Sequence, residues 1–325
     1  MDKKINIPGI LKRQNKTEYY LYKQIIFLLF LIIFFQKYIS LSQSKETNMN
    51  IFNYYSEISL LIQGTGYQNI ISDEFIYEPS DIILNNESVK DKCNRICELY
   101  KEENYITLIF NQSIDTFDNM FKNMHNLNSI NLSNFDTSKI VNMSSMFYNC
   151  SNLEKITFGN INTSLVQDMS SLFYLCSKLS SIDLSNFDTS SITDMGRMFT
   201  GCETLISIDL SNFNTSNVLN MRSMFNRCKK LISIDISYFD TSKVTSMALL
   251  FYNCTNLTTI NFGNINTSSV EDMQRMFYLC GNIKSIDVSK FDTSKVTNIA
   301  YMFYNCINLE SVYFGNINTS SVMDI

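Results

Sequence analysis

The sequence predicts an α/β repeat fold: a solenoid of parallel strands and short helices, preceded by a small β-rich cap and an N-terminal hydrophobic targeting helix. Two observations predict it. Seven cysteines recur every 26 residues without an insertion, each ending a Met-Phe-x-x-Cys or Leu-Phe-x-x-Cys motif. Each 26-residue unit also contains a short apolar–polar alternation and then apolar residues at helical spacing. The cysteines are Cys150, Cys176, Cys202, Cys228, Cys254, Cys280 and Cys306.

Residues 1–41 have the pattern of a basic leader and a signal or anchor segment. A lysine-rich stretch precedes Ile25–Phe35, which is eleven apolar residues without a break. One interpretation is a cleaved signal peptide, whose apolar core is about 7–15 residues long, with Ser40-x-Ser42 as the cleavage site. The other is an uncleaved, tilted membrane helix over about 20–41. Both place the rest of the chain outside the membrane, either anchored at the cell surface or secreted, because the basic flank stays inside.

A tether and a β-rich cap are expected before the repeats. Residues 42–51 are rich in Asn and Ser, a composition typical of a flexible connection. Over 52–119, alternating apolar residues and turn signals predict two hairpins and a further strand. The candidate strands are 58–62, 67–71, 81–84, 88–89 and 105–110, with turns at Gly64–Gly66 and Asn85-Asn86. Such a cap would cover the apolar end of the repeats.

The unit that begins at Met146 illustrates how each repeat is expected to fold. Its Leu-x-x-Ile-x-Phe pattern over 153–158 is that of the strand in a leucine-rich repeat. A turn at Gly159–Asn162 follows. A short helix is expected after Ser164, because the apolar residues from Val166 to Cys176 have the spacing of one helical face. One unit cannot bury these residues alone, so neighbouring units must stack.

Ser164-x-x-Gln167 and Ser268-x-x-Glu271 fit the capping box of a helix N-terminus, which supports the expected helices. Residues 120–325 are therefore predicted to form a leucine-rich-repeat solenoid of seven full repeats and a truncated eighth.

The repeat also resembles that of a known family. Met-Phe-x-x-Cys-x-x-Leu-x-x-Ile-x-Leu, followed by Phe-Asp-Thr-Ser-x-Val-x-x-Met, is similar to the repeat of BspA-like leucine-rich repeat surface proteins, in their 26-residue Met-Phe variant. The resemblance covers Met120 to Ile325. It implies a surface-exposed solenoid used in adhesion or partner binding, with no catalytic residues to transfer. The chain departs from that pattern in lacking Pro after the strand, and Phe135 or Ile161 replaces the buried Asn of the leucine-rich consensus.

An acidic stripe along the strands is the candidate partner-binding site. It occupies the outward strand position between Ile and Leu in successive repeats. Neighbouring strands lie about 4.8 Å apart, so successive carboxylates come close together, which is unfavourable unless they are solvated or partnered. Two interpretations stay open: a stripe that binds a cation or a partner's Lys or Arg, and a solvated ladder without a ligand. The residues are Asp183, Asp209, Asp235, Asn261 and Asp287.

The cysteines and the single histidine give no catalytic or metal site. Cys93 and Cys97 are either a local disulfide, formed in an oxidising compartment, or two thiols on one helical turn. The repeat cysteines are expected to be buried free thiols. No metal or cofactor is predicted, because no further Cys/His cluster supplies ligands. His125 has no evident nucleophile or orienting partner.

The sequence predicts a surface protein that binds a protein or glycan partner, or alternatively a membrane-anchored receptor-like or scaffold ectodomain. An enzyme is not expected. The net charge of −5 gives no support for nucleic-acid binding. The last repeat would expose apolar residues at its end, so we expect either self-association through this C-terminal face or a natural chain that continues past Ile325. These residues are Phe303, Leu309, Val322 and Met323.

Overall fold

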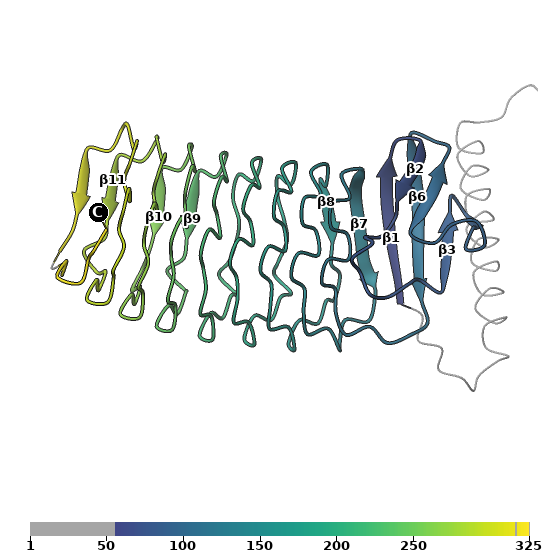
Figure 1. Cartoon of the computed structure of the whole chain (residues 1–325), viewed down its shortest axis with the longest axis horizontal. Helices are drawn as coiled ribbons and strands as arrows, with labels where there is room; N and C mark the ends of the chain where they lie inside the picture. Colours follow the sequence, from purple (N-terminus) through teal and green to yellow (C-terminus); the bar gives the residue numbers. More distant parts are fainter. Residues whose placement is uncertain (1–55, 316, 325) are drawn as a thin grey trace, which may run out of the picture. The chain divides into compact units, whose positions relative to one another are not determined.

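A computed structural model describes residues 56–315 and 317–324, which contain twelve strands and no helix (Figure 1). Tyr54–Ile325 forms one compact unit. The predicted targeting helix over 1–41 and the tether over 42–51 lie outside the described residues. Within the described ranges, no helix is long and apolar enough to cross a membrane.

The N-terminal part of the unit contains six strands in antiparallel pairs. They are β1 (Ser56–Gln63), β2 (Gly66–Asn69), β3 (Asp81–Leu84), β4 (Glu87–Ser88), β5 (Ile96–Leu99) and β6 (Glu103–Phe110). Strands β4, β3, β6 and β1 lie in that order in the main sheet, and β2 pairs with β5 in a separate two-stranded sheet. The β3–β4 hairpin turns at Asn85 and Asn86, whose φ angles of 49° and 78° are those of a type I′ turn. The other expected hairpin is wrong, because β2 pairs with β5 and not with β1.

Strand β1 joins this sheet to the repeats. It pairs antiparallel with β6 on one side and with β7 (Leu127–Asn134) on the other. Strand β7 then pairs in parallel with β8 (Lys155–Thr157). Alternate residues of β1, Ile58, Leu60 and Ile62, are buried against the core. The cap therefore covers the first repeat with a paired strand, and the outer edge of this sheet is the two-residue strand β4.

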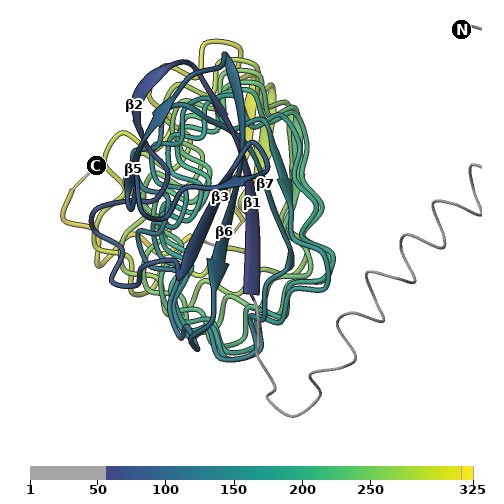
Figure 2. The same ribbon diagram turned by 90° about the vertical axis from the view of Figure 1, so that its right-hand side faces the viewer.

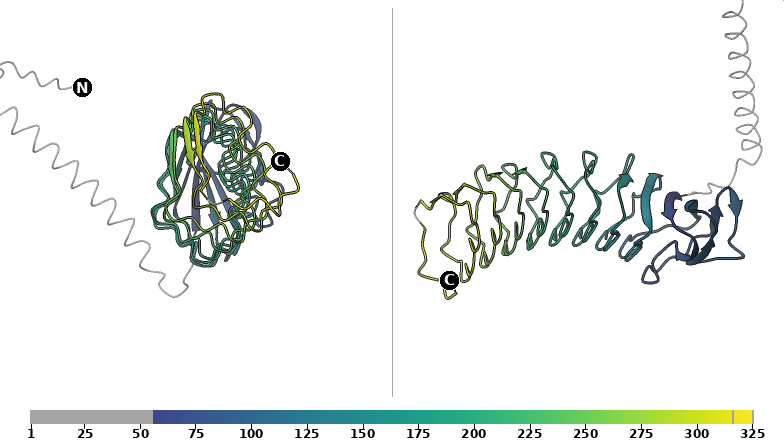
Figure 3. Two further views of the ribbon diagram at one scale, coloured as in Figure 1. Left: turned by 90° about the vertical axis from the view of Figure 1, so that its left-hand side faces the viewer. Right: turned by 90° about the horizontal axis from the view of Figure 1, so that it is seen from above.

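The repeats stack as successive 26-residue coils, which overlay one another when viewed along the stack (Figures 2 and 3). Parallel pairing joins β9 (Ser233–Asp235) to β10 (Thr259–Asn261), and β11 (Ser285–Asp287) to β12 (Ser311–Tyr313). At another corner of the coil, single parallel bridges run from Thr116 through Asn142, Asp168 and each later equivalent to Asp324. Each coil thus hydrogen-bonds to the next at several points around its circumference.

The predicted helices are wrong, and with them the α/β class: the described residues form an all-β repeat. The apolar stripe from Val166 to Cys176 lies in consecutive turns. Two residues in each coil, Ser145 and Asn149 in the coil of Met146, have φ angles of 54° and 59°, in the left-handed region. A right-handed helix cannot pass through such residues. Because turns about four residues long also bring every third or fourth side chain inward, the apolar spacing fits both structures.

The backbone hydrogen bonds explain why turns replace helix. Alternate amides bond within a turn and to the next coil: Tyr148 N donates to Ser145 O at 3.0 Å, whereas Phe147 N donates to Leu172 O at 3.0 Å. In a helix, all of these amides would bond within the segment. Here half of them hold neighbouring coils together, so stacking satisfies groups that a lone unit would leave unpaired.

The expected capping box does not form, and Ser164 takes part in a different motif. The Ser164 hydroxyl and amide both donate to Asn162 Oδ1, at 2.7 and 3.1 Å, which is an Asx turn. The Gln167 amide donates to Val141 O of the preceding coil. Thr163, which lies between Asn162 and Ser164, is buried. Its Oγ1 donates to Asp188 O and accepts from Asp188 N, both at 2.8 Å. The Phe-Asp-Thr-Ser motif therefore makes a corner and a link to the next coil.

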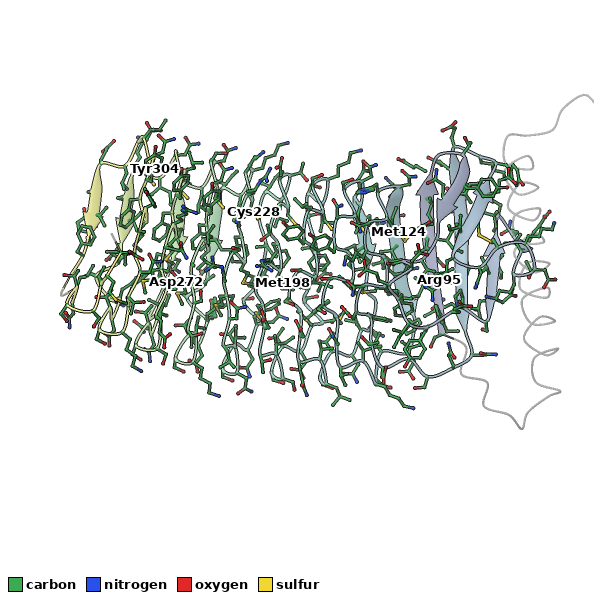
Figure 4. The ribbon with its side chains drawn as sticks, in the orientation of Figure 1. Arg95, Met124, Met198, Cys228, Asp272 and Tyr304 are labelled. Carbon is green, nitrogen blue, oxygen red and sulfur yellow. A yellow bond between two sulfur atoms is a disulfide. The ribbon has the colours of Figure 1, made fainter. Side chains whose placement is uncertain are left out.

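The core consists of columns that run along the stack. Eight phenylalanines, from Phe121 to Phe303, stack face to face with centroids 5.4–6.0 Å apart. Beside them, each cysteine thiol donates to a carbonyl of the preceding coil, as Cys228 Sγ does to Phe199 O at 3.2 Å. Figure 4 labels Cys228 and Met198 among these inner side chains. The columns require the 26-residue register to be kept without insertion.

Substitution of Ser145 by glycine distinguishes a turn from a helix, because the free energy of unfolding should rise in the first case and fall in the second. We expect Ser145→Gly to raise the free energy of unfolding by about 0.5–1 kcal/mol. Glycine removes the cost of about 1–2 kcal/mol of a left-handed residue and loses part of that gain in chain entropy. Ser145→Val should lower stability by more than about 1 kcal/mol. Urea unfolding measures both. If glycine were instead destabilising by about 1 kcal/mol, as in a helix interior, the turn assignment would be wrong.

Candidate binding surfaces

The structure brings the predicted acidic stripe together along one line of the strands. All five residues are exposed and stand at equivalent positions of successive coils. Each side chain accepts a hydrogen bond from the backbone amide two residues later. Asp183 Oδ1 accepts from Ser185 N at 3.0 Å, and Asn261 Oδ1 accepts from Gly263 N at 3.2 Å. Asn261 also donates from Nδ2 to Asp235 Oδ2 at 3.1 Å. One oxygen of each carboxylate is thus already used in its own Asx turn.

These turns stabilise the charged form of the carboxylates. Hydrogen bonds from the following serine hold the pKa of Asp183, Asp209, Asp235 and Asp287 below its usual value. The serine amide is the main cause at the first two aspartates, and the serine hydroxyl at the last two. Among the described residues, no group of three His, Cys, Asp or Glu side chains could hold a metal ion. The stripe has a local structural task in forming the corner of each coil.

Acid should therefore weaken the stack through these corners. A carboxyl whose folded pKa is depressed contributes stability above its unfolded pKa, about 3.9, and loses it as pH falls through the folded pKa. We expect the free energy of unfolding to fall between pH 4 and pH 2. Replacing all four aspartates with Asn keeps the hydrogen-bond acceptor and should make the free energy of unfolding depend less on pH in this range. Urea unfolding at a series of pH values measures this dependence. Glu310→Gln, at an exposed site outside these turns, is the control and should leave the slope unchanged.

Cys93 and Cys97 form a disulfide in the cap. Cys97 is buried in β5, and Cys93 lies in the turn before that strand. The repeat cysteines are free, and all but the half-buried Cys306 are buried. Burial raises the pKa of the Cys254 thiol to about 12, which keeps it protonated and a poor nucleophile. His125 Nδ1 lies 3.3 Å from Ser151 Oγ. Neither the thiols nor the histidine are placed for a shared site.

A second surface, which the sequence analysis missed, lies on the turns. We call it the turn face: the outward residues of the segments equivalent to Ser144–Asn149. Its main feature is a ladder of tyrosines at the position two residues before five of the seven cysteines, half-buried except for the exposed Tyr304. Tyr148 and Tyr174 stack at 4.4 Å between ring centroids. Tyr252, Tyr278 and Tyr304 stack at 4.8 Å, with Tyr304 labelled in Figure 4. The available signal in the sequence was the recurrence of Tyr in the Met-Phe-Tyr-x-Cys motif.

All four arginines of residues 120–325 are on this turn face. Arg222 Nη1 pairs with Asp272 Oδ2 at 3.0 Å, and Arg227 Nη2 pairs with Glu203 Oε1 at 3.3 Å. Arg275 lies over the Tyr301 ring at 5.5 Å. Arg197 has no carboxylate within 4.0 Å among the described residues. At the end of the ladder, Lys122 Nζ lies 5.5 Å from the Tyr148 ring centroid. The turn face therefore combines aromatic rings with cationic groups.

The last described coil has an open apolar interior. A cavity of about 720 Å³ is lined by residues that include Phe303, Tyr304, Phe314 and Val322. Leu309 is half-buried, and Met323 is exposed. Each of these inner positions is covered by the following coil elsewhere in the stack.

The fold and these surfaces define a repeat protein in which an interlocked backbone displays variable side chains at fixed intervals. A family model described as "Mycoplasma protein of unknown function, DUF285" matches residues 115–233 and 229–325. The two matches cover more than half of the chain, which therefore belongs to this family. The second match begins inside the first, as expected when one repeated architecture is detected twice. A search of curated proteins found no match.

Proposed function

We propose that the chain is a cell-surface binding protein that uses its repeats to hold a protein or glycan partner. The turn face is the observation that carries this proposal. Tyr and Arg are, with Trp, the residues enriched at binding hot spots, whereas Lys and Glu are depleted at interfaces. The stacked tyrosines hold one another in place, so little side-chain entropy is lost when a partner binds. The resemblance to BspA-like surface proteins supports the same class of function.

We also propose that the repeats lie outside the membrane. The support is the basic leader followed by Ile25–Phe35, which is the order of a signal or anchor segment. If this segment is retained, the protein is an anchored, receptor-like ectodomain; if it is cleaved, the protein is released. Mass spectrometry of the mature N-terminus separates these two cases. Protease applied to intact cells should remove the repeats, and full protection of the repeats would contradict an outside location.

The binding experiment uses the full chain on the cell surface or in a mild detergent. We expect it to bind cells, or arrayed glycans and matrix proteins, in a way that Tyr252→Ala/Tyr278→Ala weakens at least tenfold. Two substitutions on another corner, Lys243→Gln and Lys295→Gln, are the matched control and should change binding less than twofold. Equal binding by all variants would show that the turn face is not the binding surface.

Self-association through the open apolar face is a second proposed interaction. Burial of this face against a second copy would gain about 25 cal/mol per Å² of apolar area. Sedimentation should reveal a concentration-dependent dimer that Val322→Asp weakens. A monomer at high concentration for both forms would show that this face does not pair copies of the chain.

A further inference from the structure

The tyrosine ladder is interrupted in the middle of the turn face. At the two equivalent positions between Tyr174 and Tyr252 stand Thr200 and Asn226. Three coil spacings of about 4.8 Å separate the two flanking rings, which is about 14 Å. Among the described residues, Tyr174 and Tyr252 stack on no aromatic ring across this break. The break is therefore where the aromatic ladder lacks rings that a sugar ring can replace.

The break is also where positive charge is concentrated. Residues 193–204 and 219–230, which form these two coils' turns, carry five cationic side chains against two carboxylates, in a chain with a net charge of −5. Arg227 and Lys229 share the single carboxylate of Glu203, at 3.3 and 2.9 Å. Arg197 is exposed and has no carboxylate partner among the described residues. An exposed guanidinium without a carboxylate partner can bind the carboxylate of a ligand through two parallel hydrogen bonds.

A buried polar atom in the break lacks a partner. Asn226 Oδ1 is shielded from solvent and accepts no hydrogen bond in the described structure, and it is the one such side-chain atom there. Thr200 Oγ1, one coil earlier, already donates to Ser223 O at 2.6 Å. Buried polar groups are nearly always hydrogen-bonded, so this unpaired acceptor is an unmet hydrogen-bonding requirement. The Asn226 side chain as a whole is half-buried, so a rotation of its amide group would bring the oxygen to the surface, where a ligand hydroxyl can donate to it.

We propose that the break in the tyrosine ladder binds an acidic sugar residue of a carboxylated glycan. Such a residue carries a carboxylate for Arg197, hydroxyl donors for Asn226 and an apolar C–H face for a tyrosine ring. An acidic peptide offers carboxylates and amide donors but no such ring face. The proposal rests on the proposed function, because it assigns a ligand class and a subsite to the same turn face.

The test is titration of the full chain with a hexasaccharide of alternating glucuronate and N-acetylglucosamine. The neutral comparison is a hexamer of N-acetylglucosamine, and the acidic peptide comparison is hexaglutamate. We expect the acidic hexasaccharide to bind at least tenfold more tightly than either comparison, and its affinity to fall with added salt. Tighter binding of hexaglutamate would overturn the ligand class.

Two double variants locate the site. Thr200→Tyr/Asn226→Tyr completes the ladder with the residue that five other coils have, so it should fold and should lose at least tenfold in affinity. Arg197→Gln/Arg227→Gln should also lose at least tenfold, whereas the charge-matched Lys243→Gln/Lys295→Gln should change affinity less than twofold. Unchanged affinity in both turn-face variants would place the glycan elsewhere. No binding of the hexasaccharide, together with tyrosine-dependent binding to cells, would overturn this inference and leave the proposed function standing.

Discussion

Phe199→Ala should lower the free energy of unfolding by about 3–5 kcal/mol, the range measured for a large buried aromatic side chain. The Phe199 ring is fully buried and stacks on Phe173 at 5.5 Å and on Phe225 at 5.7 Å. Truncation leaves a cavity between two rings that cannot close, because backbone hydrogen bonds fix the distance between coils. Urea unfolding, followed by circular dichroism and by proteolysis, measures the loss.

The same substitution should change how the stack unfolds. In a repeat protein, stability is roughly the sum of each unit and its contacts with two neighbours, so a weak central coil divides the stack. We expect a second transition or a new protease-sensitive site near residue 199. Tyr238→Ala, at a side chain that is 64% exposed, is the control and should cost less than about 0.5 kcal/mol. An equally small effect at Phe199 would contradict a continuous phenylalanine column.

Thr189→Val should cost about 2 kcal/mol, although the side chains have the same shape. The buried Thr189 hydroxyl donates to Asn214 O at 3.0 Å and accepts from Asn214 N at 2.8 Å. Valine leaves both backbone groups of the next coil unpaired, and an unpaired buried group costs about 1–3 kcal/mol. For the two groups together we expect a cost at the lower end of this range, because Asn214, which carries both, is exposed to water. Urea unfolding is again the measurement.

Two further variants separate the hydroxyl from the methyl group. Thr189→Ser keeps the hydroxyl and loses one methyl group, so we expect a cost of about 1 kcal/mol or less. Thr193→Val removes a hydroxyl that is exposed and donates to Gln167 O at 3.2 Å, and should be nearly neutral. If Thr189→Val were also neutral, the threonine column would not be a link between coils.

The sequence determined which side chains point inward but not the path of the backbone between them. The 26-residue period, with its Leu, Phe and Cys positions, correctly predicted stacked units and parallel pairing. The helices were wrong because apolar residues three and four positions apart suit both a helix and consecutive turns. Asn149, Asn253 and Gly201 are residue types that favour the left-handed region, and they marked the turns. Arg197 and Leu249, which adopt the same conformation, carry no such signal.

Of the two candidate surfaces, the acidic stripe was singled out in the sequence and the turn face was not. The residues of the acidic stripe stand at equivalent positions of successive coils, as the 26-residue period predicts. Their use of one side-chain oxygen for a local turn depends on backbone direction, which a single strand pattern does not reveal. The tyrosine ladder was visible as a period in the sequence. Its meaning required the coil spacing, which brings residues 26 apart within stacking distance. The buried acceptor of Asn226 depends on surrounding side chains and could not be read from any motif.

The interlocking of each coil with the next has a consequence for how such genes change. Because one coil presents to its successor the same amide groups that it receives from its predecessor, a copied coil fits between any two others without new contacts. Duplication or loss of whole 26-codon segments should therefore be tolerated, whereas loss of a single codon would shift every column that follows. We expect gain or loss of whole repeats to produce variants with stacks of different length, each with the same cap.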